Sequence, residues 1–357
     1  MHKVWRATGD KGLLDERRRV PSPKRADAVE IATVRKLDTT KHFDFNIKHF
    51  HEMLVEKHGL RRGYTWTKGV LQEAGLCERA PKKGKHRRRR ERRAMVGMLM
   101  HLDGSTHRWF GPEGRQMDLL AVLDDANSEV YALLLCEQES THSCMTILRQ
   151  VVEKKGVFCE LYTDRGSHFC YTPEAGKGPS KTVTTDLGRA MEQLQIRLIL
   201  ANSPQARGRG ERLWETIQGR LPQELRLAGI DTVAAAQKYF DEEFLPRLNR
   251  LVQVPAAEAD SAFVSLVGVD LDRVFCSRDE RSVDNDNTIK YERKRFQIPK
   301  NRLRATYAGC RVTLEELPNG RMSIWYGQHL LGRYSADAKL VEAPPTAIVE
   351  RRAEVAA

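Results

Sequence analysis

The stretch MVGMLMHLD (residues 95–103) is the first of three consecutive apolar runs that each end in acidic residues. The runs MDLLAVLDDAN (117–127) and EVYALLLCEQES (129–140) follow it along the chain. Short apolar runs of this kind are typical of strands that are buried on both faces of a sheet. We therefore expect three consecutive strands from residue 95 onward.

The segments after these runs complete a recognisable order of elements. We expect a helix, a strand, a helix, a strand and long helices at 141–156, 158–164, 184–196, 197–202 and about 207–250. This is the element order of the ribonuclease-H-like α/β fold. Its mixed five-stranded sheet begins as an antiparallel meander, continues with parallel strands and carries helices on both faces.

Three acids occupy positions that this fold brings together. Asp103 ends the first strand, Asp164 ends the fourth, and Glu211 opens the first long helix beyond the fifth. Since strands one and four are neighbours in such a sheet, we expect the three acids to meet. Carboxylates that meet repel one another unless cations lie between them. A two-ion site, with Mg²⁺ or Mn²⁺ about 3.5–4 Å apart, would relieve this repulsion and supply phosphoryl-transfer chemistry.

Other acids near these positions leave alternatives open. Glu215 lies one helical turn beyond Glu211 and is a rival for the third acid. Asp124 and Asp125 end the second strand, and we expect them to be solvated turn residues.

Residues 1–78 form a helical region with a helix-turn-helix pattern. FNIKHFHEMLVEKHGL (45–60) places apolar residues at helical spacing and ends at Gly59, and a second short helix is expected in YTWTKGVLQEAGL (64–76). Two short helices joined by a turn that contains Gly63 favour a DNA-binding unit. A generic helical hairpin is the alternative.

The segment from residue 79 to 94 is expected to be a basic linker. Its first fifteen residues, RAPKKGKHRRRRERR, hold ten Lys or Arg against one acid, so the segment has nothing apolar to bury. We interpret it as a linker that follows the phosphate backbone of DNA. The candidate contacts are Lys82, Lys83, Lys85, Arg87, Arg88, Arg89 and Arg90.

The part after the catalytic core (95–255) is expected to hold a connector (256–285), a small β module (286–336) and a disordered tail (337–357). An Asn319-Gly320 turn between CRVTLEEL and RMSIWYG predicts a hairpin, and a five-stranded SH3-like barrel fits the module. A basic stretch in the module is interpreted as a non-specific DNA contact: Lys290, Arg293, Lys294, Arg295, Lys300, Arg302 and Arg304.

Composition supports a polyanionic partner and a reducing compartment. Lys and Arg number 60 against 48 acids, a net charge of +12. The seven cysteines form no CxxC pair, which suits reduced thiols, and no stretch approaches the length of a membrane span. We expect a bacterial cytoplasmic protein, associated with the nucleoid, without a membrane partner.

Four blocks of the core resemble the integrase-core transposases of bacterial insertion sequences, of the ISNCY type. They are HLDGSTHRWF (101–110), LLAVLDDANSEVYAL (119–133), LYTDRGSHF (161–169) and ANSPQARGRGERLWETIQGRL (201–221). The resemblance implies a DDE transposase with Asp103, Asp164 and Glu211 as its acids. Such an enzyme cuts at element ends and joins 3′-hydroxyls to target DNA as a homo-multimer.

The resemblance also gives meaning to residues beside the acids. Arg207, Arg209 and Arg212 surround Glu211 and would contact phosphates, as would Asn202, Ser203 and Gln205 in the loop before them. For the arginines, a solvated helix face with nearby charge compensation is the alternative. His107 and Trp109 would contact DNA near the site, or else pack within a turn.

The region before the helix at 47–58 is shorter than is usual in the group, so a truncated reading frame is an alternative. An inactive transposase-derived DNA-binding protein is therefore the second hypothesis for function. A nuclease for RNA–DNA hybrids is the third.

Overall fold

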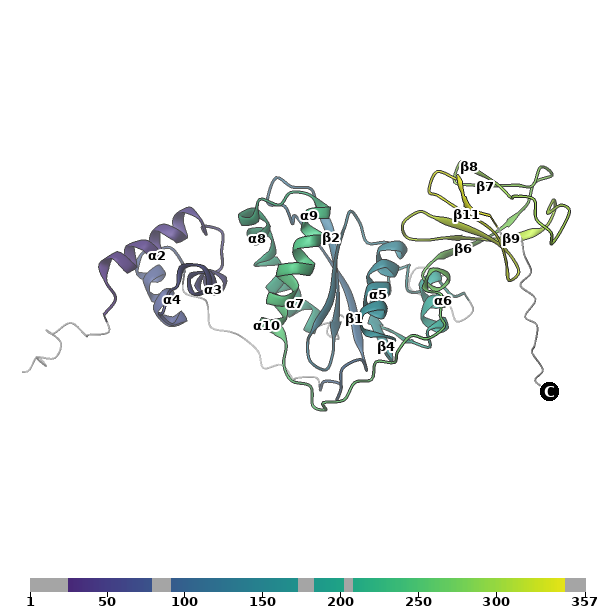
Figure 1. Ribbon diagram of the computed structural model, residues 1–357. Coiled ribbons are helices and arrows are strands. Elements are labelled where there is room, and N and C mark those ends of the chain that lie inside the picture. The colour runs from purple at the N-terminus through teal and green to yellow at the C-terminus, as the bar shows by residue number, and fades with distance from the viewer. Residues whose placement is uncertain (1–24, 79–90, 173–182, 202–207, 344–357) are drawn as a thin grey trace, which may run out of the picture. The chain divides into compact units, whose positions relative to one another are not determined.

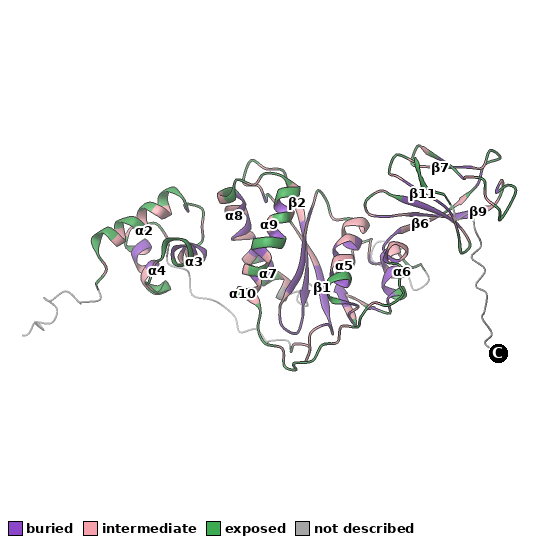
Figure 2. Cartoon of the chain, in the orientation of Figure 1, coloured by how far each residue is buried: buried purple, intermediate pink, exposed green. Residues whose placement is uncertain are grey.

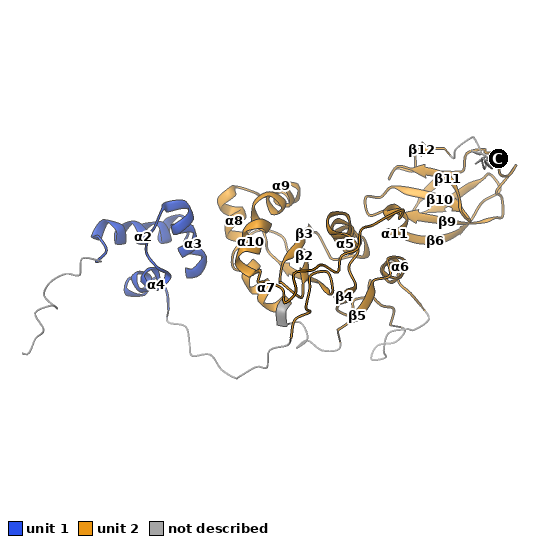
Figure 3. Ribbon diagram, turned by 60° about the horizontal axis from the view of Figure 1, so that its bottom comes forward, with its two compact units in different colours: residues 1–87 blue, residues 88–357 orange. Residues whose placement is uncertain are grey.

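The computed structural model describes residues 25–78, 91–172, 183–201 and 208–343. The chain divides into two compact units, residues 1–87 and residues 88–357, which Figure 3 colours separately. Among the described residues, no helix is long and apolar enough to cross a membrane.

Within residues 25–78, the first unit contains the helices α2 (Ala28–Thr40), α3 (Ile47–His58) and α4 (Tyr64–Glu73). The Asn46 side chain caps α3 by accepting a hydrogen bond from the His49 amide, and Gly59 ends α3 in the left-handed conformation that glycine favours. Phe50, Leu54 and Leu71 are fully buried between the helices. The two helices and the turn predicted at 45–76 are therefore present.

The second unit is built on a five-stranded sheet with the order β3-β2-β1-β4-β5 (Figure 1). Its strands are β1 (Met100–His107), β2 (Met117–Asp124), β3 (Val130–Cys136), β4 (Glu160–Thr163) and β5 (Arg197–Leu200). The first three pair antiparallel, whereas β4 and β5 add in parallel to β1. This topology confirms the predicted ribonuclease-H-like fold.

Helices cover both faces of this sheet. The helices of the second unit's core are α5 (Thr141–Lys155), α6 (Asp186–Gln193), α7 (Gly208–Gln218), α8 (Leu221–Ala228), α9 (Val233–Tyr239), η4 (Phe240–Phe244) and α10 (Leu245–Val252). Leu120 and Val122 of β2 pack with α5 and α6, whereas Leu119 and Leu123 pack with α7 to α10. Figure 2 shows the strands buried between these layers. Because neighbouring strand residues point to opposite faces, β1 presents Asp103 and Gly104 to different layers.

A third group of elements follows the core: α11 (Leu271–Val274), β6 (Ser277–Ser282), β7 (Thr288–Tyr291), β8 (Lys294–Gln297), β9 (Arg311–Glu316), β10 (Met322–Tyr326), β11 (His329–Tyr334) and β12 (Leu340–Glu342). The predicted hairpin is present as β9 and β10, and β11 pairs next. The sheet order is β12-β11-β10-β9-β6, with β7 and β8 as a separate pair. The small β module expected from the sequence is therefore present as an antiparallel sheet. Among the described strands, β6 and β12 are its edges and do not pair with each other to close an SH3-like barrel.

Two strands of this sheet lie where the sequence suggested other structure. β6 falls within the segment expected to be a connector, and β12 falls within the expected disordered tail. The polar sequence of β6, SRDERS, has no apolar alternation, and β6 is fixed by pairing with β9 along six residues. Residues 344–357 lie outside the described part of the chain.

Asp124 and Asp125, expected to be solvated turn residues, are instead fully buried. Asp124 accepts hydrogen bonds from the backbone amides of Gly97 and Ala126 and from the Tyr131 hydroxyl, at 2.8–3.1 Å. Burial raises the pKa of Asp124 above the ordinary value of an aspartate. The expectation is wrong because the position of Asp124 after an apolar run does not reveal that Gly97, 27 residues away, and Tyr131 of the next strand lie beside it in the folded core.

Asp125 holds the segment that enters the sheet. Its carboxylate accepts from the Arg93 amide at 2.8 Å and lies 2.9 Å from His101 Nε2. Arg92 donates to the Asp125 carbonyl at 3.1 Å and to the Ser128 hydroxyl at 2.7 Å. Asp125 therefore anchors Arg92 and Arg93, the last arginines of the predicted basic linker, to the core.

We expect Asp124→Ala to lower the free energy of unfolding by about 3 kcal/mol or more, because it leaves three buried donors without their acceptor. Tyr131→Phe removes one of these three bonds and should cost only about 1 kcal/mol. Urea denaturation of the full chain measures both. A change below about 0.5 kcal/mol for Asp124→Ala would contradict the anchoring role.

Candidate active site

Asp103 lies on β1 and faces helix α7. Its Oδ2 accepts a hydrogen bond of 3.1 Å from Trp214 Nε1, and the residue is half-buried. A Cβ added at Gly210 would stand 2.9 Å from the same oxygen, so the first turn of α7 lies directly against the carboxylate. The absence of a side chain at Gly210 allows this close approach.

Asp164 follows the last residue of β4. The parallel register pairs Met100 with Leu161 and His101 with Tyr162, and extending it by two residues sets Asp103 beside Asp164. The Gly166 amide donates to Asp164 Oδ1 at 2.7 Å, which orients the carboxylate. The fold therefore brings the first two predicted acids to adjacent positions on neighbouring strands. Asp164 directly follows β4 as expected, whereas Asp103 lies within β1, which continues to His107 through its pairing with β2 and does not end at Asp103.

Glu211 and Glu215 are both exposed on α7. The face of α7 that contacts β1 contains Gly210 and Trp214 at Asp103, and Gln218, which donates to the Ser105 hydroxyl at 2.8 Å. Glu211 directly follows Gly210, and Glu215 directly follows Trp214, so both flank this face. Chain position favours Glu211, because Gly210 brings the helix backbone closest to Asp103, and Glu215 stays the rival.

The donors at this site suit a hard divalent cation. Asp103 and Asp164 offer carboxylate oxygens at adjacent positions, and each is oriented by a neutral N–H group, the Trp214 indole or the Gly166 amide. Mg²⁺ and Mn²⁺ prefer such oxygen ligands. The carboxylates of Asp103 and Asp164 therefore fit the divalent cations expected from the sequence.

The structure describes only some of the residues that are predicted to contact DNA. Arg212 is exposed on α7, one residue beyond Glu211. Arg209 belongs to the same helix, but its side chain lies outside the part of the chain that the structure describes. The remaining predicted contacts lie outside the described residues: Lys82, Lys83, Lys85, Arg87, Arg88, Arg89, Arg90, Asn202, Ser203, Gln205 and Arg207.

Trp109 packs within the core and offers no surface for stacking on DNA. It is fully buried, and its Nε1 donates to the Met117 carbonyl at 2.9 Å. His107 lies edge-on to this indole with ring centroids 5.1 Å apart, and burial lowers the pKa of His107. Of the two interpretations, the structure favours packing for Trp109.

Two cations in the basic stretch of the C-terminal module form ion pairs with aspartates. Lys290 Nζ lies 2.9 Å from Asp284, and Arg295 lies 3.9 Å from Asp286. Both ion pairs are substantially exposed, so they leave the cations accessible to a polyanion.

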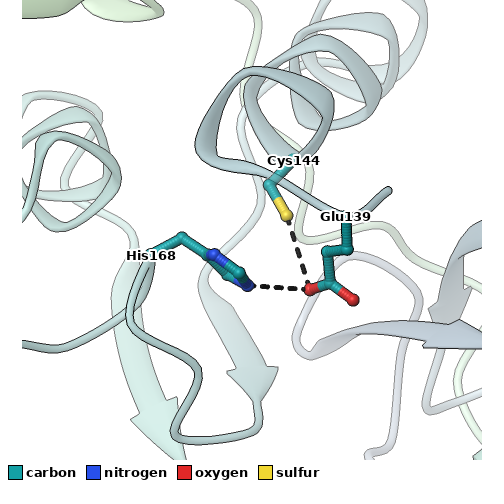
Figure 4. A group of neighbouring side chains, drawn as sticks. All are labelled: Glu139, Cys144 and His168. Carbon is teal, nitrogen blue, oxygen red and sulfur yellow. Dashed lines mark hydrogen bonds and ion pairs between the residues drawn. The ribbon is translucent and has the colours of Figure 1, made fainter. Parts of the chain in front are cut away.

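A group of side chains that sequence reasoning missed lies next to the two aspartates. Glu139 Oε1 is 3.0 Å from His168 Nε2 and 3.7 Å from Cys144 Sγ (Figure 4). Burial and the neighbouring Glu139 raise the pKa of Cys144, so its thiol donates to Glu139 and is a poor metal ligand in this state. His168 belongs to the block that carries Asp164, but nothing in the sequence indicates that Glu139 is its partner.

Two relatives match most of the chain. The protein y4bF of Sinorhizobium fredii, which is named as a transposase, is 30% identical over 316 residues, 87% of this chain and 68% of that protein. The transposase for insertion sequence IS1202 of Streptococcus pneumoniae is 25% identical over 333 residues, 82% of this chain and 69% of that transposase. No family model matches the chain.

Solved structures with a similar chain trace include viral integrases. The catalytic core domain of HTLV-2 integrase in complex with magnesium (trimeric form) has a TM-score of 0.32 and 13% identity, and covers 41% of this chain and 85% of its own. The simian T-cell lymphotropic virus intasome in complex with PP2A regulatory subunit B56 gamma has a TM-score of 0.31 and 13% identity, with 83% and 97% covered. The fold assignment rests on strand order and register, to which these scores add no weight.

Proposed function

This chain belongs to the transposases of bacterial insertion sequences, and on that premise we propose that it cuts element ends and joins them to target DNA by metal-dependent phosphoryl transfer. We assign the metal-binding acids as Asp103, Asp164 and Glu211. The divalent cation is Mg²⁺ or Mn²⁺, in a two-ion site.

One observation carries this proposal. The β1–β4 register extends to set Asp103 beside Asp164, and Gly210 brings the first turn of α7 against the Asp103 carboxylate. Three elements far apart in sequence, the inner strand β1, the end of the inner strand β4 and helix α7, thus converge at one place, with Glu211 next to the point of contact. A merely structural strand end would not require acids from two strands and a helix at one place.

The protein contributes to the chemistry by orienting the carboxylates of Asp103 and Asp164. The Trp214 indole holds Asp103, and the Gly166 amide holds Asp164, so each carboxylate is directed before substrate arrives. When bound, divalent cations would activate the attacking water or 3′-hydroxyl and stabilise the leaving oxygen. Pre-oriented ligands limit the reorganisation that binding and reaction require.

We further propose how the chain holds DNA. The α3–α4 unit would read the element end, and the basic linker would follow the phosphate backbone. Arg207, Arg209 and Arg212 would contact phosphates near the acids, and the basic stretch of the C-terminal module would add non-specific affinity. Since two ends must be joined together, the active form would be a homo-multimer on DNA.

The third acid is tested by a matched pair on α7. We expect Glu211→Gln to lower the rate of strand transfer by about 10²–10³-fold, a loss typical of removing one charge-stabilising group. Glu215→Gln removes the same charge one turn away and should change the rate by no more than about threefold. The measurement is joining of cognate ends to target DNA with Mg²⁺ or Mn²⁺, with DNA binding followed in parallel.

The outcomes separate the alternatives. If Glu215→Gln loses joining and Glu211→Gln keeps it, Glu215 is the third acid. If the wild-type chain binds the ends but joins nothing, the inactive DNA-binding protein is the better account. Cleavage of an RNA–DNA hybrid without joining would favour the nuclease.

A further inference from the structure

Glu139 and His168 form a pair behind the two aspartates. Glu139 lies between β3 and α5, and His168 lies four residues beyond Asp164, in the turn that follows β4. Glu139 Oε1 and His168 Nε2 are 3.0 Å apart, and both side chains are partly buried (Figure 4). A charge-assisted hydrogen bond of this length is stronger than a neutral one.

One end of the pair touches the strand of Asp103. A Cβ added at Gly104 would stand 2.5 Å from Glu139 Oε2, so the carboxylate lies against the backbone of β1. Gly104 follows Asp103 and points to the opposite face of the strand. Glu139 therefore supports β1 from the α5 side at the level where Asp103 faces α7.

The other end touches the turn of Asp164. A Cβ added at Gly166 would stand 2.9 Å from His168 Nε2 and 3.0 Å from Asp164 Oδ1. The Gly166 amide is also the donor that orients Asp164. His168 therefore packs against the residue that fixes the second carboxylate.

Glu139 is itself held in place. Its backbone amide donates to Asp118 Oδ2 on β2 at 2.7 Å, and Cys144 on α5 donates to its Oε1. A partner fixed to a strand and a helix can transmit position to the groups it touches. The pair thus links both acid-bearing segments to the rigid part of the fold.

We propose that Glu139 and His168 are positioning residues that set the spacing of Asp103 and Asp164 for cation binding. This inference rests on the proposed function of the two aspartates as cation ligands. The pair acts through Gly104 and Gly166 and touches neither DNA nor the reacting atoms.

The test is the affinity of the full chain for Mn²⁺ alone, measured by the electron paramagnetic resonance signal of free Mn²⁺. Removing a group that orients metal ligands costs about 10–100-fold in metal affinity, so we expect Glu139→Ala and His168→Ala each to weaken binding by about tenfold or more. His168→Gln keeps an N–H donor at about the position of Nε2, the atom that contacts Glu139, and should restore most of the Mn²⁺ affinity.

A matched control separates positioning from charge. Glu137 is two residues from Glu139, is exposed, and pairs with Arg115 at 2.8 Å. Glu137→Ala removes the same charge and should change Mn²⁺ affinity by about twofold or less, because exposed pairs contribute little. A loss as large as that of Glu139→Ala would overturn the positioning role in favour of a long-range charge effect.

Two further variants address folding and coupling. Gly104→Ala should displace the flexible end of Glu139 and weaken Mn²⁺ binding while the charge remains. The Glu139→Ala/His168→Ala double variant should lose no more Mn²⁺ affinity than either single variant, because each single substitution already breaks the interaction between Glu139 and His168. Additive losses, or Gly104→Ala at wild-type affinity, would overturn the proposal.

Mn²⁺ binding by the Asp103→Asn variant distinguishes failure of this inference from failure of the proposed function. If Asp103→Asn abolishes Mn²⁺ binding while Glu139→Ala and His168→Ala keep it, the pair has no positioning role and the cation site stands. If Asp103→Asn leaves Mn²⁺ binding unchanged, both proposals are wrong.

Discussion

The double variant Asp103→Asn/Asp164→Asn should join no detectable transposon ends and yet unfold at the same temperature as the wild type or higher. Two carboxylates at adjacent positions on neighbouring strands repel one another in the metal-free protein, so neutralising them removes a destabilising interaction. The same change removes the ligands that would hold the cations. The several kcal/mol of charge stabilisation that cations supply correspond to a loss of about 10⁴-fold in rate.

Thermal unfolding without added metal and strand transfer with Mn²⁺ measure the two halves of this result. Asp241→Asn is a suitable control, because Asp241 is an exposed acid on η4 whose Lys154 partner lies 3.9 Å away. It should change neither quantity appreciably. Substantial joining by the double variant, or a marked loss of its stability, would contradict the assignment of these aspartates as cation ligands.

The sequence predicts that the two aspartates lie side by side because apolar runs locate the buried strands. It locates the end of only one strand: Asp164 directly follows β4, whereas β1 continues past Asp103 to His107, because the polar residues after Asp103 pair with β2. The order of elements then makes β1 and β4 neighbours, and the observed register agrees. The position of Glu211 is less constrained, because a helix repeats every 3.6 residues and presents Glu215 beside it.

The apolar runs of the sequence do not predict which acids become buried and hydrogen-bonded in the folded protein. Asp124 and Asp103 both follow apolar residues in a strand, but the donors to Asp124 come from Gly97, Ala126 and Tyr131. Local sequence shows only that an acid ends a strand. Whether the acid meets water, a cation or buried N–H groups depends on segments that approach in the folded state.

Local sequence also does not predict side-chain pairs that are distant in the chain, or which strands form the edges of a sheet. Glu139 and His168 are 29 residues apart, and neither has a local pattern that names its partner. Strand β6 is polar and lacks the alternation that marks a strand, so its place at the edge of the C-terminal sheet depends on pairing with β9. Closure of this sheet into a barrel would require its edges to pair, and β6 and β12 are separated by three strands.

The basic linker should dominate the salt dependence of DNA binding. We expect replacement of its seven candidate cations by Ser to reduce the slope of log affinity against log salt by up to about 6, since each neutralised phosphate contributes about 0.9. The substituted residues are Lys82, Lys83, Lys85, Arg87, Arg88, Arg89 and Arg90. Titration of random-sequence duplex DNA at several salt concentrations measures this slope without requiring cognate ends.

The matched control is the basic stretch of the C-terminal module, which also holds seven cations: Lys290, Arg293, Lys294, Arg295, Lys300, Arg302 and Arg304. Here Lys290 and Arg295 already face Asp284 and Asp286, so part of their charge is compensated before DNA arrives. Replacing this set should therefore reduce the slope by less than replacing the linker set. An unchanged slope for the linker variant would show that its charge does not lie along phosphates, and equal slopes for both variants would show that net charge matters more than position.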